Sequence, residues 1–142
     1  MLVKVCGMRE PENIEKVAQL GVDMMGFIFY PKSPRFASLS VARTAADKNV
    51  CRVGVFVNES VELISAKIQL FDLNAVQLHG NESRELCEQL HEQNGLLKVI
   101  KAISVSTVRD IQKYKEYVGA VDYFLFDTKC KTVGGSGQQF DW

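Results

Sequence analysis

The sequence has little of what binding to a charged polymer, a membrane or a metal requires. Its 17 Lys+Arg and 17 Asp+Glu residues leave no formal net charge, so it presents no broad basic field to a nucleic-acid backbone or an anionic membrane surface. No apolar run approaches the roughly 20 residues that span a bilayer, and no basic leader precedes a long apolar stretch. We therefore expect a cytoplasmic protein that binds neither nucleic acid nor membrane.

Cysteine and histidine are too sparse and too scattered for a zinc site. The four cysteines include no Cys-x-x-Cys pair, and the chain has only two histidines, so no metal is expected. In the absence of a signal peptide, reduced thiols are favoured over disulfides. Cys51 and Cys87 are predicted to be structural, on a strand start and a helix face, and Cys130 to be a loop thiol.

Apolar runs of strand length alternate with helical patterns along the whole chain, and strand starts recur about every 24 residues. The predicted strands are Leu2–Cys6, Asp23–Phe29, Arg52–Val57, Ala75–His79, Leu97–Ala102 and Val121–Asp127. The predicted helices run from Pro11 to a Gly21 cap, near Val41–Lys48, along Val61, Ile64 and Ile68, from an Asn81 cap through Leu86 and Leu90, and after Ser106 through Val108 and Ile111.

This alternation predicts a parallel sheet covered by helices, either an open doubly wound sheet or a closed barrel. The first strand–helix junction, after Cys6, lacks the Gly-x-Gly-x-x-Gly fingerprint of a dinucleotide-binding fold. Its absence favours the barrel. In barrel enzymes the active site lies where the strands end and the following loops begin.

Three strand ends carry titratable groups on the face that alternation assigns to the barrel interior. If Cys6, His79 and Asp127 face inward, Lys4, Gln77 and Leu125 do too, and the apolar Val3, Val5, Val76, Leu78, Phe124 and Phe126 face the helices. From the strand pattern alone, the usual role of a cysteine such as Cys6 is that of a small core residue, and His79 could be a core histidine whose hydrogen bonds are satisfied. Asp127 would cost several kcal/mol if buried unpaired, so it must face solvent, a partner or a ligand.

Six stretches in chain order are similar to motifs of the phosphoribosylanthranilate isomerase family of tryptophan biosynthesis. They are Lys4–Gly7, Gly26–Arg35, Val53–Val57, Val76–Gly80, Phe126–Thr128 and Gly134–Trp142. The resemblance implies a (β/α)8 TIM barrel that isomerises N-(5′-phosphoribosyl)anthranilate to 1-(2-carboxyphenylamino)-1-deoxyribulose 5-phosphate, an Amadori rearrangement that uses no metal or cofactor.

The resemblance also implies roles for individual residues. Asp127 matches the general acid and Cys6 the general base of the family. Arg35 matches the arginine that holds the anthranilate carboxylate, although a solvated loop arginine is the alternative. His79 is assigned to the substrate pocket, and Gly135 and Gly137, with Gly134, to a loop that closes over the substrate. From the strand pattern alone, we add Lys4 as a candidate to stabilise the Cys6 thiolate.

The family barrel has eight strands, and the chain supplies six of them, so we expect one incomplete barrel domain over residues 1–142 that ends in the sixth βα loop. Barrel phosphate sites commonly lie after the seventh and eighth strands. An open sheet also exposes its edges. We therefore expect a C-terminally truncated chain rather than a complete one that closes its barrel in another way, for example by association. We expect it to be inactive or nearly inactive alone, and to self-associate or be poorly stable. The alternatives are another phosphate-binding barrel enzyme, a lyase or decarboxylase acting on a ribose phosphate, and a non-catalytic fragment.

Overall fold

Six parallel strands form one sheet in the order of the chain. The computed structural model describes residues 1–43 and 50–128, and within them each strand pairs with the next, from β1 to β6. The strands are β1 (Lys4–Cys6), β2 (Met24–Ile28), β3 (Cys51–Phe56), β4 (Ala75–Leu78), β5 (Lys98–Val105) and β6 (Tyr123–Thr128). All six predicted strands are confirmed, and β5 continues past the predicted end at Ala102.

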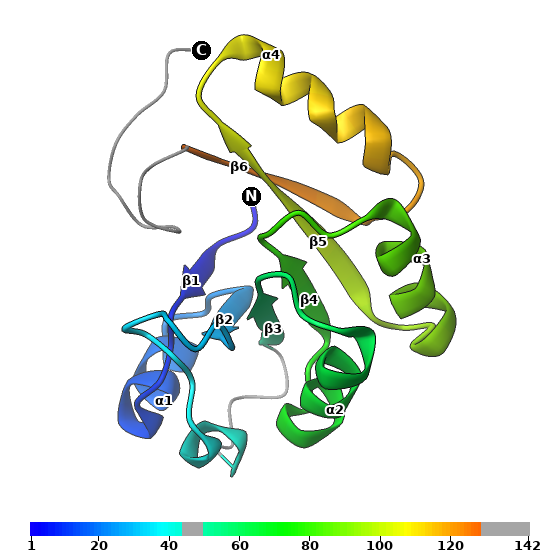
Figure 1. The fold of residues 1–142 in the computed structure, drawn as a ribbon. Coiled ribbons are helices and arrows are strands. Elements are labelled where there is room, and N and C mark those ends of the chain that lie inside the picture. The colour runs from blue at the N-terminus through cyan, green and yellow to red at the C-terminus, as the bar shows by residue number, and fades with distance from the viewer. Residues whose placement is uncertain (44–49, 129–142) are drawn as a thin grey trace.

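The helices lie around the outside of the curled sheet (Figure 1). They are α1 (Pro11–Gln19), α2 (Val61–Phe71), α3 (Arg84–Gln93) and α4 (Val108–Ile111), with the 3-10 helices η1 (Leu39–Arg43) and η2 (Gln112–Tyr117). Pro11 occupies the first turn of α1, where the missing N–H costs nothing. Gly21, with a φ of 74°, follows that helix as predicted. None of the described helices is long and apolar enough to cross a membrane.

The predicted Asn81 cap of α3 is wrong, because the helix begins two residues later. Ser83 is the N-cap, and its Oγ accepts a hydrogen bond from the Leu86 N–H at 3.3 Å. Asn81 belongs to the preceding loop, where its backbone N–H donates to Asn58 Oδ1 at 2.7 Å. The two residues are both good caps, and a tertiary contact decides between them.

Two other predicted helices differ from the structure. Of the segment Val41–Lys48, the described part belongs to η1, in which the Val41 N–H donates to the Ser38 carbonyl, the i to i−3 bond of a 3-10 helix. After Ser106, the α-helix lasts only one turn before it tightens into η2. Val108 is 62% exposed, so the predicted apolar stripe does not include it.

Apolar side chains pack on both faces of the sheet. Between the sheet and the helices lie Ile14, Phe27, Phe56, Ile64, Phe71, Val76, Leu78 and Leu90. A smaller cluster of Val53, Ala75 and Ile100, with Met24 and Cys51 against it, forms separately. Since Ala75 and Val76 are neighbours on β4 and belong to different clusters, the two clusters mark the two faces. Gln77 therefore lies on the face opposite Val76 and Leu78, as predicted.

The face that carries Gln77 is concave. Lys4 on β1 donates from Nζ to Gln77 Oε1 on β4 at 2.8 Å, although β2 and β3 separate those strands in the sheet. Side chains from non-adjacent strands meet in this way only when the sheet curls toward the closure of a barrel. The carboxyl ends of the strands thus surround a common space.

Candidate active site

Cys6 ends β1 beside Lys4 and Gly26. Cys6 is exposed and its thiol is free. A Cβ added to Gly26 would lie 2.6 Å from Cys6 Sγ and 3.1 Å from Lys4 Nζ. The thiol and the ammonium group therefore lie side by side over the neighbouring strand, in space that any larger residue at position 26 would fill. The predicted shared face of Lys4 and Cys6 is confirmed.

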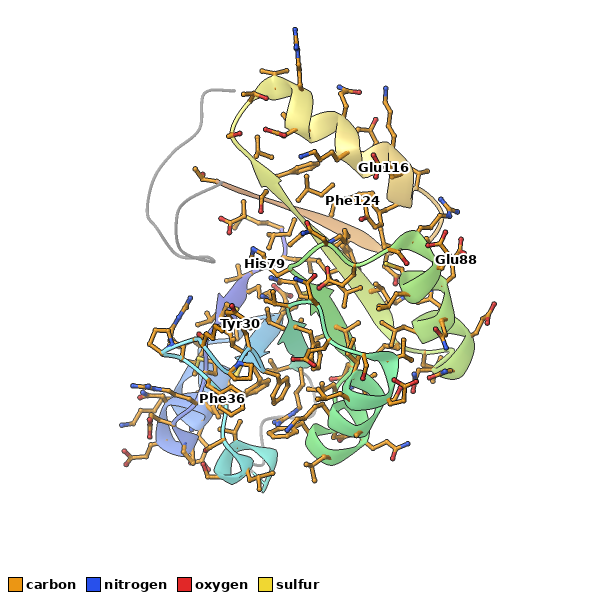
Figure 2. All side chains as sticks on the ribbon, viewed as in Figure 1. Tyr30, Phe36, His79, Glu88, Glu116 and Phe124 are labelled. Carbon is orange, nitrogen blue, oxygen red and sulfur yellow. The ribbon has the colours of Figure 1, made fainter. Side chains whose placement is uncertain are left out.

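A line of hydrogen-bonding side chains crosses the concave face from β1 to β6. Beyond the Lys4–Gln77 contact, Gln77 Nε2 lies 3.2 Å from His79 Nδ1, and His79 Nε2 lies 3.3 Å from Asp127 Oδ2. The side chain of His79 is 11% exposed and that of Asp127 32% exposed. Figure 2 shows His79 among the strands, well inside the helices that carry Glu88 and Glu116.

Burial lowers the pKa of His79, and nearby Lys101 lowers it further, while Asp127 acts in the opposite direction. The direction of the shift favours a neutral imidazole. Such a ring donates from one nitrogen and accepts at the other, so His79 can link two polar neighbours without adding charge to the site.

Arg35 lies against the end of β1. Its Nη1 donates to the Cys6 carbonyl at 3.2 Å, and a Cβ on Gly7 would lie 2.7 Å from that nitrogen. Gly7 also has a φ of 89°, which a residue with a side chain rarely adopts. The side chain of Arg35 is exposed, so an anionic ligand above Cys6 can reach a guanidinium group suited to a carboxylate.

A buried ion pair near the carboxyl ends of the strands was not predicted from the sequence. Lys101 Nζ lies 2.9 Å from Glu82 Oε2, with side chains only 3% and 1% exposed. Glu82 also accepts hydrogen bonds from the backbone N–H groups of Asn58 and Gly80. The signal was present, because Lys101 interrupts an apolar strand just as Asp127 does.

The three cysteines within the described residues differ in exposure, which predicts the order of alkylation among them. Burial raises the pKa of Cys87 to about 11 and also raises that of the half-buried Cys51. Because the thiolate is the reactive form, we expect iodoacetamide at mildly alkaline pH to modify Cys6 first, Cys51 more slowly and Cys87 last. Peptide mapping by mass spectrometry after timed quenches measures the order. Modification of Cys87 before Cys6 would contradict it.

Three of the predicted site residues, Gly134, Gly135 and Gly137, lie outside the described residues, as does Cys130. The structure brings the other four to the carboxyl ends of the strands. Cys6 and Arg35 lie in contact at one side of the sheet, and His79 and Asp127 lie in contact toward the other. Gln77 and Lys4 connect the two pairs.

Comparison with known proteins identifies the family. A profile described as N-(5′-phosphoribosyl)anthranilate (PRA) isomerase matches residues 3–142. The chain belongs to this family. It is 47% identical to the PRA isomerase of Parabacteroides distasonis over all of its length and 65% of that relative. The chain thus spans slightly less than two thirds of that protein.

Solved PRA isomerases have the same fold as this chain. The crystal structure from Thermotoga maritima superposes with a TM-score of 0.84 and 41% identity, covering 100% of this chain and 69% of the other. Another, at 39% identity and a TM-score of 0.77, covers 91% of this chain and 66% of the other. It is a complex with reduced 1-(o-carboxyphenylamino)-1-deoxyribulose 5-phosphate. These matches confirm the prediction of a barrel over a doubly wound sheet, with six of its strands described here.

Proposed function

We propose that the chain carries the acid and base of a PRA isomerase, which converts N-(5′-phosphoribosyl)anthranilate to 1-(2-carboxyphenylamino)-1-deoxyribulose 5-phosphate. The observation that carries this proposal is the line of side chains that joins Lys4, beside Cys6, to Asp127 across the concave face. The enzyme would be an isomerase of the aldose–ketose type. Membership of the family and its likeness to the complex with the reduced product support the same substrate class.

In the first step, Asp127 acts as the general acid. Its carboxyl group gives a proton to the ribose ring oxygen, the bond from that oxygen to C1′ breaks, and the nitrogen lone pair forms an iminium ion. Asp127 is left as a carboxylate, and the adjacent His79 Nε2 at 3.3 Å is within reach of it. A positioned acid of this kind typically accelerates a reaction by about 100- to 10,000-fold.

In the second step, Cys6 acts as the general base. Its thiolate takes the proton from C2′, and the electron pair of that C–H bond forms an enolamine that tautomerises to the ketone. The reaction needs the ionised sulfur, because a neutral thiol is a poor base. The Lys4 ammonium beside Cys6 Sγ supplies a positive charge where the thiolate forms.

Arg35 is the residue proposed to bind the substrate carboxylate. A guanidinium group offers parallel N–H donors that match two carboxylate oxygens. Because the chain has no net charge, a local cation must perform this recognition without a long-range attractive field. We also assign Gly135 and Gly137 to the loop that closes over the substrate.

Isothermal titration calorimetry with the reduced product analogue tests this function without requiring turnover. We expect saturable binding, and Arg35→Lys should weaken it about tenfold, because lysine loses the paired donors but keeps the charge. Arg109, exposed on α4, provides a matched control, and Arg109→Lys should bind the analogue as the parent does. The absence of saturable heat in the parent would contradict the proposal and favour a non-catalytic fragment.

A further inference from the structure

Hydrogen-bond chemistry fixes the direction of every donor in the line from Lys4 to Asp127. A lysine ammonium has only donors, so the Gln77 atom 2.8 Å from Lys4 Nζ must be the amide oxygen. The amide nitrogen of Gln77 then faces His79 Nδ1 at 3.2 Å. Since an amide nitrogen only donates, Nδ1 must accept and carries no proton.

The tautomer of His79 follows from this arrangement. A neutral imidazole has one N–H group, and with Nδ1 occupied as an acceptor that group is at Nε2. Nε2 lies 3.3 Å from Asp127 Oδ2, so its N–H group is within reach of that oxygen. Protonation of Nδ1 would direct its N–H against the amide protons of Gln77, so the same contact opposes the imidazolium form.

We propose that Gln77 and His79 are positioning residues that decide which oxygen of Asp127 carries the acidic proton. Oδ2 accepts from His79 Nε2–H, so the proton of the acid is on Oδ1. When Asp127 gives up that proton, the bond from His79 becomes a hydrogen bond to a charged acceptor, which is roughly twice as strong as a neutral one. His79 therefore stabilises the product of the proton transfer more than its starting state, an effect that lowers the barrier.

This inference rests on the proposed role of Asp127, but its structural half can be tested without catalysis. The only two histidines of the chain are His79 and His91, so long-range proton–nitrogen NMR spectra of the 15N-labelled chain contain two imidazoles, and His91→Gln assigns them. At mildly alkaline pH we expect His79 to be the Nε2–H tautomer. An Nδ1–H tautomer or an imidazolium would overturn the proposal.

Gln77→Glu is the decisive variant, because it replaces the amide donor with an acceptor of almost the same shape. The introduced carboxylate would accept from Lys4 and also from His79, so Nδ1 of His79 should become protonated while the spectrum of His91 stays unchanged. Lys4→Met removes the group that orients the amide, so the single tautomer should give way to a mixture. A His79 spectrum identical in parent and both variants would overturn the proposal.

Kinetics test the catalytic half. In Gln77→Glu we expect kcat for isomerisation to fall about tenfold while KM changes less than twofold, since the lost interaction acts on proton transfer and not on binding. An unchanged kcat, or a rise in KM alone, would overturn the positioning role. The rates are measured on the chain joined to the part of the Thermotoga maritima enzyme beyond the matched 69%. If that protein shows no isomerisation, the proposed function and this half of the inference fail together, whereas the tautomer result stands by itself.

Discussion

Cys6→Ser and Asp127→Asn should each lower kcat for isomerisation by about 100- to 10,000-fold, the range that a lost general acid or base produces. Serine keeps the size of the cysteine side chain, but its hydroxyl is far less readily ionised. Asparagine keeps the shape of the aspartate but has no carboxyl proton to give. The measurement is steady-state turnover of N-(5′-phosphoribosyl)anthranilate, with circular dichroism to show that each variant is folded.

The assay is best run on two forms of the protein. One is the 142-residue chain, and the other joins it to the part of the T. maritima enzyme that lies beyond the matched 69%. Cys51→Ser is the matched thiol control, because Cys51 is half-buried at the start of β3, away from the strand ends that carry the site. It should keep at least half of the parent rate. Equal turnover by the joined parent and by its Cys6→Ser and Asp127→Asn variants would refute the assigned roles.

Lys101→Met should lower the free energy of unfolding by about 3–5 kcal/mol, because it leaves the Glu82 carboxylate buried without its counter-charge. Both side chains are at most 3% exposed, so water cannot replace the lost ammonium. Lys101 also donates to the carbonyl groups of Leu78 and Gly80, which would lose a partner. Urea unfolding of parent and variant measures the difference.

Lys113→Met is the control for this prediction. Lys113 also pairs with a carboxylate at 2.9 Å, that of Asp110, but its side chain is 57% exposed, and such pairs contribute less than about 1 kcal/mol. Lys101→Met combined with Glu82→Gln should be less destabilised than Lys101→Met alone, since the unpaired charge is removed. If Lys101→Met lost no more stability than Lys113→Met, the buried pair would not stabilise the fold as predicted.

The sheet could be predicted because each strand is an apolar run, and a helical segment separates it from the next strand. Val76 and Leu78 could be assigned to the helix side, and Gln77 to the other, because side chains alternate along a strand. Phe124 was placed correctly in the same way, and its ring meets that of Tyr114 on η2 at 5.7 Å. The face on which a strand residue lies can therefore be predicted from the local sequence alone.

Contacts that depend on curvature or on loop paths could not be predicted. Strand alternation put Lys4 and Gln77 on one face but gave no reason for β1 and β4 to meet, since that requires the curl of the whole sheet. The start of α3 was misplaced because Asn81 and Ser83 are both good caps, and Asn58, from another loop, decides between them. The ion pair of Lys101 was missed because its partner comes from a loop 19 positions away.

The carboxylate of Glu82 limits how independently three segments of the chain can move. It holds the N–H groups of Asn58 and Gly80 and the ammonium of Lys101, which belong to the loop after β3, the loop after β4 and strand β5. None of these three segments can open alone without breaking a bond to the same buried group, so they form one cooperative unit. Because His79 immediately precedes Gly80, fluctuations that would disturb its ring require that whole unit to open.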